Sequence, residues 1–218
     1  AATALRIKAT DQLNGTIEQF NGVVSSVVMD WNGEDWVQQP SSNPASLYRH
    51  VLQGLANARP LDDDRIDLDK LQSWHERCSE NSREFNGVVS SGQSVMDVLN
   101  DITAAGRASP NLIDGKWGVV EDLPEQTVVQ HFTPRNSFGF EAEKAFEEHP
   151  DALRVRFNNR DQGWQLDERV VYDDGFGESN ASNFESLTLN GVTSADQAWR
   201  DARYHMASAR LRSEIYSF

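Results

Sequence analysis

Apolar positions along this chain follow two different periods, and the change from one to the other outlines its elements. In the first 30 residues, Leu5, Ile7 and Ala9 alternate with basic side chains, and pairs of valines follow. Alternation with a period of two is typical of strands with one buried face. We therefore expect short strands over residues 5–30, joined by turns at Asn-Gly pairs.

Helical spacing of apolar residues takes over after the polar stretch 38–46. Asn43 is placed to cap a first helix directly before Pro44, a residue that is well tolerated in a first helical turn. Asp67 or Asp69 can cap a second helix. The pattern predicts helices over residues 44–55, 67–78 and 95–105.

The seven-residue word Phe-Asn-Gly-Val-Val-Ser-Ser occurs twice, at 20–26 and at 85–91. The similarity does not extend beyond the word, as it would in a duplicated supersecondary unit. The word also holds no base that could activate its serines. We interpret both copies as strands that share a sequence.

Strand and turn signals return in the second half. Asp114-Gly115 between apolar pairs predicts a hairpin, so that residues 44–121 form a compact unit of helices, a strand and a hairpin. Ser194 or Thr193 can cap a final helix, with Gln197 as capping-box partner of Ser194 and an alanine-rich face suited to packing on a sheet. The pattern of residues 138–146 is ambiguous and fits either a helix or a strand. Further strands are expected around Val128-Val129, 153–157, 170–172 and 187–189. The fold class is α+β.

Composition and charge exclude several classes of function. The chain of 218 residues has a formal charge of −14, which makes it a poor general binder of nucleic acid. No apolar run is long enough to insert in a membrane, and no secretory signal is present. The single cysteine, Cys78, excludes an intramolecular disulfide framework. The start at Ala1, without methionine, suggests a processed product or a fragment of a longer protein.

Candidate metal ligands are few. His75 and Cys78 are three residues apart on a predicted helix, but a structural zinc site needs about four ligands, and we expect both side chains to be structural. The acidic run 62–64 favours a helix start over a cation site. Residues 173–185 lack the spacing of an EF-hand, so we interpret them as a solvated loop. No metal or cofactor is expected.

The sequence signals for catalytic residues are equally weak. Glu121 and Asp122, beside a tryptophan-bearing hairpin, would be the carboxylate pair of a glycoside hydrolase, but such a pair is expected by chance among 34 acidic residues. The chain has no phosphate-binding glycine loop, nucleophile elbow or zinc-protease motif. We therefore assign no catalytic residue and expect no enzymatic activity.

A succession of longer words is more informative than any one motif. They are "NPASLYRHVLQG", "IDLDKLQSWHERCSE", "REFNGVVSSGQSVMDVLNDITAAGRA", "DGKWGVVED", "RVRFNNRDQGWQLDERVVYDDG" and "LNGVTSADQAWRDARYHMASARLR". In this order they resemble the central region of phage tail tip proteins of the host-specificity type, also called tip attachment protein J. The resemblance covers roughly residues 30–216.

The resemblance implies a structural role. Proteins of this family form a trimeric hub that closes the tail tube and leads into the central fibre. By analogy, residues 1–40 and 126–218 would build a barrel-like portion similar to tail-tube folds, and 43–125 an inserted α+β unit. The chain would be made in the bacterial cytoplasm and reside in the virion tail tip, as a homotrimer in contact with other tail proteins. An acidic lining of the hub channel would repel DNA.

Two other classes remain open. A carbohydrate- or receptor-binding module would use exposed tryptophans, such as Trp31, Trp36, Trp117 and Trp164. Trp31 and Trp36 are also expected to stack across a turn at Asn32-Gly33. A cell-wall hydrolase would need a cleft with two carboxylates of different pKa.

Overall fold

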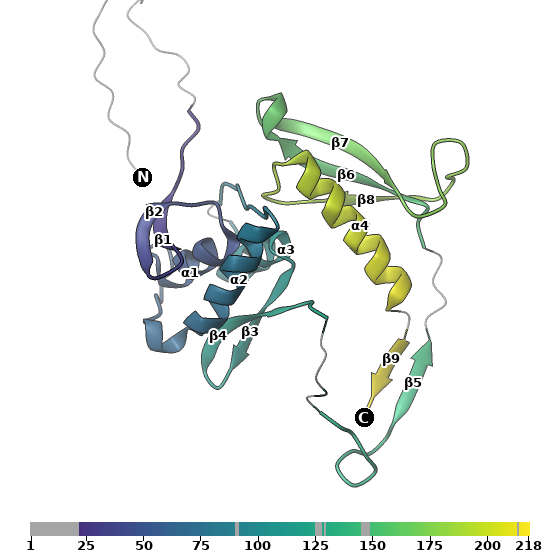
Figure 1. The fold of residues 1–218 in the computed structure, drawn as a ribbon, viewed down its shortest axis with the longest axis horizontal. Coiled ribbons are helices and arrows are strands. Elements are labelled where there is room, and N and C mark those ends of the chain that lie inside the picture. Colours follow the sequence, from purple (N-terminus) through teal and green to yellow (C-terminus); the bar gives the residue numbers. More distant parts are fainter. Residues whose placement is uncertain (1–21, 90–91, 125–127, 129, 145–148, 213) are drawn as a thin grey trace, which may run out of the picture.

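The computed structural model describes residues 22–89, 92–124, 128, 130–144, 149–212 and 214–218. It has an α+β fold with three parts (Figure 1). The helical unit, residues 27–121, holds three helices and two hairpins. The sheet unit, residues 152–211, is a three-stranded sheet with one long helix. A two-stranded ribbon, β5 with β9, lies below them in the view.

The helical unit begins with the hairpin of β1 (Val27–Trp31) and β2 (Trp36–Pro40). Helices α1 (Pro44–Gln53), α2 (Leu68–Glu80) and α3 (Val95–Ala105) follow, and β3 (Ala108–Ile113) pairs with β4 (Lys116–Glu121). The predicted caps are confirmed: the side chain of Asn43 accepts from the backbone of Ala45, and that of Asp67 from Lys70. Asp114 and Gly115 both have positive φ, as expected for the predicted two-residue hairpin turn.

The core of this unit is built around Trp74 and Tyr48, both fully buried and packed edge to face at 6.0 Å. Their polar atoms have partners as well. The indole of Trp74 donates to the carbonyl of Gly106, which ties α2 to the end of α3. The hydroxyl of Tyr48 donates to the carbonyl of Gly118, which ties α1 to β4.

The sheet unit has strand order β7-β6-β8. In β6 (Ala152–Asn159), every second side chain from Leu153 to Asn159 is buried, as the period of two predicts. β7 (Gln165–Tyr172) is antiparallel to β6, and β8 (Phe184–Thr188) is parallel to it. α4 (Ala195–Leu211) crosses this sheet (Figure 1) with Ala198, Ala202 and Met206 buried, which confirms the predicted packing at these positions. Trp199 and Ala209, expected on the same face, are exposed instead.

Three predictions about strands are wrong in the described residues. Residues 85–89 of the second seven-residue word have no regular structure, because their backbone groups bond elsewhere: Phe85 N–H donates to Ser42 and Asn86 N–H to Gly191. Val128 lies in no strand either. In the first copy of the word, residues 22–26 are irregular and the strand begins at Val27. The predicted strands over 5–21 and residues 90–91 and 129 fall outside the described residues.

The ribbon consists of β5 (Glu141–Lys144) and β9 (Glu214–Ser217). β5 therefore gives part of the ambiguous stretch 138–146 a strand conformation, while 145–146 are not described. All sheets of the described residues are open, and no barrel closes among them. The division into segments 1–40, 43–125 and 126–218 stays a prediction.

The two units share one hydrophobic core, which includes Leu99 and Val119 on one side and Val155, Phe157 and Ala202 on the other. None of the helices in the described part of the chain has the length and apolar character needed to cross a membrane.

Candidate functional site: the cleft between the two units

A cleft of about 560 Å³ opens between the helical unit and the sheet unit. Its walls come from the end of α3, the hairpin β3–β4, the loop after β8, and α4. Alanine, valine and leucine side chains line much of it, and the ionisable groups come from both units. These groups are Asp101, Arg107, Glu121, Asp122, Asp201, Tyr204, His205 and Arg212.

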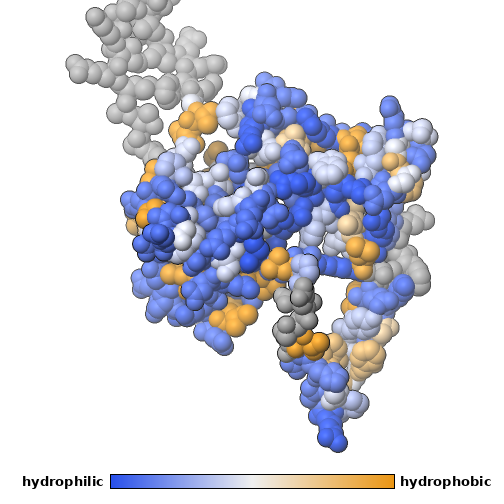
Figure 2. All heavy atoms as spheres, in the orientation of Figure 1, coloured by the Kyte–Doolittle hydropathy of each residue, from blue (hydrophilic) through white to orange (hydrophobic). Residues whose placement is uncertain are grey.

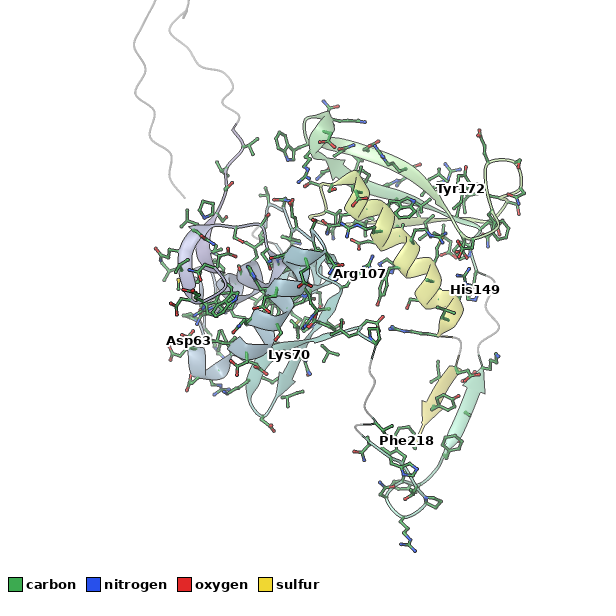
Figure 3. All side chains as sticks on the ribbon, in the orientation of Figure 1. Asp63, Lys70, Arg107, His149, Tyr172 and Phe218 are labelled. Carbon is green, nitrogen blue, oxygen red and sulfur yellow. The ribbon has the colours of Figure 1, made fainter. Side chains whose placement is uncertain are left out.

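Arg107 lies between the helical unit and α4 of the sheet unit (Figure 3). It follows Gly106, which ends α3, and has a positive φ of 54° that a non-glycine residue rarely adopts. Its guanidinium donates to Asp201 Oδ1 (3.1 Å) and to the carbonyl of Arg200 (2.7 Å), and lies 4.7 Å from the ring centre of Tyr204. One side chain of the helical unit thus contacts two successive turns of α4.

Asp201 is a buried acid of the cleft, with 4% of its surface exposed. Burial raises its pKa above the ordinary value, and the nearby guanidinium of Arg107 opposes that shift. Its second oxygen, Oδ2, is buried and accepts no hydrogen bond from the described residues. Asp201 is therefore held as the buried acceptor of Arg107.

The acids at the rim of the cleft have partners from distant parts of the chain. Asp122 Oδ2 accepts from the hydroxyl of Tyr204 (2.7 Å) and pairs with Arg212. Desolvation, and then the Asp122 carboxylate, raise the pKa of Tyr204. Desolvation lowers the pKa of His205, which favours its neutral form.

Glu121 and Asp122, the nominated hydrolase pair, are thus both held by cations. Glu121 is bound by two nitrogens of the Arg77 guanidinium, in a bidentate pair whose carboxylate is almost wholly buried. A carboxylate that acts as nucleophile or base must approach substrate or water, and these two are engaged with protein groups instead. The arrangement is suited to holding segments together.

His75 and Cys78 are both buried, as predicted, but have different partners. His75 Nε2 lies 2.9 Å from Asp30 Oδ1, whereas Cys78 Sγ lies 4.0 Å from the carbonyl oxygen of Gly106. Burial raises the pKa of the Cys78 thiol to about 12, so the reactive thiolate is scarce at neutral pH. Neither side chain is placed for metal binding or nucleophilic attack.

Asp30 is a buried centre that sequence reasoning missed. Its carboxylate accepts from Ser46 (2.5 Å), Gln39 (2.6 Å) and Ser41 (2.7 Å), in addition to its contact with His75. Burial alone would raise its pKa, but these four hydrogen bonds outweigh that effect and lower it. The only signal in the sequence is an acid in an otherwise apolar strand, Val27–Trp31.

The two acidic loops are also occupied by protein groups. Asp63 accepts from Arg49 (2.8 Å) and Gln53 (2.7 Å) at the end of the helical unit where Figure 3 labels it. Asp173 and Asp174 both pair with arginines of α4, namely Arg203 and Arg210. Within the described ranges, no three His, Cys, Asp or Glu side chains form a group that could hold a metal ion.

The four nominated tryptophans lie on separate elements. Trp31 and Trp36 pair across the first hairpin with ring centres 5.8 Å apart, as predicted, and Trp36 also lies beneath the guanidinium of Arg49. Trp117 is partly buried against the core, and Trp164, after the turn that follows β6, is 49% exposed. They do not gather into one aromatic platform. Trp199 on α4, which sequence reasoning did not nominate, is also exposed.

Arg107, Asp201 and Tyr204 were missed as well, because their association depends on how α4 docks and no local motif marks it. No family model matches the sequence, and no curated protein compared with it shows significant similarity.

Proposed function

We propose that this chain is a structural component of a phage or prophage tail tip, part of the hub between the tail tube and the central fibre. It acts there as a homotrimer in contact with other tail proteins and has no catalytic activity of its own. The observation that carries the proposal is the order of the words that resemble the host-specificity family, together with the elements that they form.

Those elements support the proposal one by one. The "NPA" word begins α1, with Pro44 in its first turn, and the next word forms α2, near whose end Cys78 lies. The "DGK" word makes the turn between β3 and β4, and the last word makes α4. Residues 85–89 do not form the strand that the family would place before α3, and no barrel closes among the described residues.

The chemistry of the cleft fits the same role. Asp201 and Asp122 are engaged with Arg107, Arg212 and Tyr204 in contacts that connect the helical part of the chain to α4, and Glu121 is held by Arg77 within the helical unit. A hydrolase needs carboxylates directed at substrate instead. The proposed barrel portion would arise when the open edges of β7 and β8 receive further strands in the assembled tail. The charge of −14 would keep a channel lined by this chain from binding DNA.

The test is the solution mass of the purified chain, measured by light scattering over a concentration series. We expect a species of three times the 24.5 kDa monomer at the higher concentrations. A chain that stays monomeric at all of them would contradict self-assembly of this region. The binding alternative would then be tested by quenching of tryptophan fluorescence with host surface polysaccharide.

A further inference from the structure

The ribbon of β5 and β9 carries a loop that exposes aromatic side chains. All eight residues of the two strands are exposed, and the ribbon extends away from the helical and sheet units (Figure 1). Residues 132–140, called the tip loop from here on, precede β5 and lie at the lower end of the ribbon in that view. In this loop Phe138 is 92% exposed and Phe140 is 67% exposed. Figure 2 shows hydrophobic residues on the same region, as expected of a surface that contacts another molecule.

The tip loop is held in shape by its own hydrogen bonds. Asn136 Oδ1 accepts from the backbone N–H (2.6 Å) and the hydroxyl (2.9 Å) of Thr133, and Asn136 Nδ2 donates to the carbonyl of His131 (2.9 Å). The backbone N–H of Ser137 donates to the carbonyl of Thr133 (3.0 Å). A loop that is ordered before it binds loses less conformational entropy on binding. Phe138, which follows Ser137 directly, is therefore presented by a preformed turn.

The cleft between the helical unit and the sheet unit can receive such a side chain. Its volume of about 560 Å³ is within the range of pockets that bind small molecules, so an aromatic ring fits inside it. The apolar part of its lining consists of three alanines together with Val120, Leu187, Leu189 and Val192. Val120 keeps 52% of its surface exposed. An aromatic ring placed against these side chains removes apolar surface of both partners from water.

The charges of the tip loop and the cleft are complementary. Arg135 is the one ionisable side chain of the tip loop, is exposed, and forms no ion pair with any described residue. Four carboxylates and two guanidiniums line the cleft, and three of these carboxylates are paired with arginines. The fourth, Asp101, accepts from the amides of Asn190 (3.0 Å) and Gln93 (3.4 Å), and no cation of the described residues pairs with it. The cleft can therefore accept the charge of Arg135.

The two complementary surfaces lie on different parts of the chain. No residue of the tip loop is among those that line the cleft of its own chain. When a surface and its complement occupy different places on one molecule, they connect copies head to tail, and such a chain of contacts closes into a ring if the rotation between copies allows it. The occupant that these features fit is a second copy of this chain.

We propose that the tip loop of one copy inserts into the cleft of a second copy, with Phe138 against the apolar walls and Arg135 paired with Asp101. Three such contacts would close the homotrimer of the proposed function. The inference rests on the proposed function in one respect, namely that copies of this chain assemble with one another.

Two variants of the full chain each remove one half of the contact. Phe138→Ser removes the aromatic ring, and Ala104→Trp fills the cleft from an exposed position of α3 that lines it. We expect each variant to raise the concentration needed for half-assembly at least about tenfold, measured by light scattering, because few residues carry most of the binding energy of an interface. The matched controls are Ile215→Ser, on the ribbon outside the tip loop, and Asn100→Trp, exposed on α3 outside the cleft. Both controls should assemble as the unsubstituted chain does.

A mixing experiment tests the head-to-tail character of the contact. The Phe138→Ser chain keeps an intact cleft, and the Ala104→Trp chain keeps an intact tip loop. An equal mixture should therefore form a species of two chains, although each variant alone stays monomeric at the same concentration. Circular dichroism of each variant checks that its fold is intact.

A charge exchange tests the ion pair. Arg135→Glu or Asp101→Lys alone should weaken assembly, because each places like charges together in the contact. The chain with both substitutions should recover assembly, since the pair is restored with its signs reversed.

Each outcome supports or overturns the inference. Unsubstituted chains that assemble, together with variants that assemble equally well or a mixture without a two-chain species, would overturn the inference and leave the hub function standing. An assembly of another size that both variants abolish would support the inference and contradict the hub trimer. A chain that is monomeric at every concentration would contradict both.

Discussion

At the scale of single residues, the polar side chains that matter are those that are buried with partners. Sequence patterns located the buried positions of α2, including His75 and Cys78, because burial follows helical spacing. They did not show what these side chains contact. Asp30 and His75 are 45 positions apart, and only the packing of the first hairpin on α1 and α2 brings them together. The same holds for Arg107 and Asp201.

Asp30 gives the residue-scale prediction. Its pKa is lowered from the ordinary value of 3.8 in the folded protein, so its carboxylate stabilises the fold above that pH and the contribution is lost as the pH falls through the folded pKa. Asp30→Asn should cost about 2 kcal/mol near pH 7, because it leaves buried donors unpaired. The difference from the unsubstituted chain should shrink below pH 4, as measured by urea unfolding.

The control is Asp64→Asn, which neutralises an exposed acid in the short helix after α1 and should change stability by less than about 0.5 kcal/mol at either pH. A cost for Asp30→Asn that stays constant from pH 7 to pH 3 would contradict the account of Asp30.

At the scale of elements, helices were predicted well and isolated strands poorly. A helix start is a local event: Asn43, Asp67 and Ser194 cap with their own neighbours in sequence, so the signal is in the sequence itself. A strand needs a partner. The segment 85–89 has a composition typical of strands, yet its backbone N–H groups donate to Ser42 and Gly191. The sequence of the segment itself does not exclude these hydrogen bonds.

Phe85 shows what that segment does instead, and supports a prediction. Its ring packs so closely on Gly191 that a Cβ there would lie 2.3 Å from it, at a backbone φ of +72°. Gly191→Ala should therefore combine backbone strain with overpacking and cost about 2–4 kcal/mol. Gly163→Ala is the matched control, with nearly the same φ (+71°) and open space, and should cost about 1 kcal/mol.

Chemical denaturation of the two variants measures the difference. Equal losses would mean that the Phe85 ring moves aside at little cost, and that the irregular segment is not anchored by this contact.

At the scale of the whole molecule, the helical unit and the sheet unit share one core and are joined by Arg107. The sequence predicted elements on both sides of the cleft, but the cleft itself, lined by residues from Asp101 to Arg212, depends on a docking that no local pattern records. Since a shared core couples the two units, we expect them to unfold together.

The measurement follows urea unfolding by tryptophan fluorescence and by far-ultraviolet circular dichroism, whose transitions should coincide. Arg107→Ala removes the partner of a buried acid and should shift both curves by the same amount, about 3 kcal/mol. Two separate midpoints, or a shift in one curve only, would show that the units fold independently and would favour an autonomous inserted unit.

Gln197, buried on α4, has a consequence for how such chains can vary. Its amide oxygen accepts from the N–H of Glu84, and its amide nitrogen donates to the carbonyls of Glu84 and Ala105. The side-chain amide of Gln197 thus makes the hydrogen bonds that a backbone peptide group of a neighbouring strand would make. Asparagine is one methylene too short, and glutamate lacks the donor. Over evolutionary divergence this glutamine should change far less than the exposed Trp199 beside it, although no hydrophobic pattern marks it.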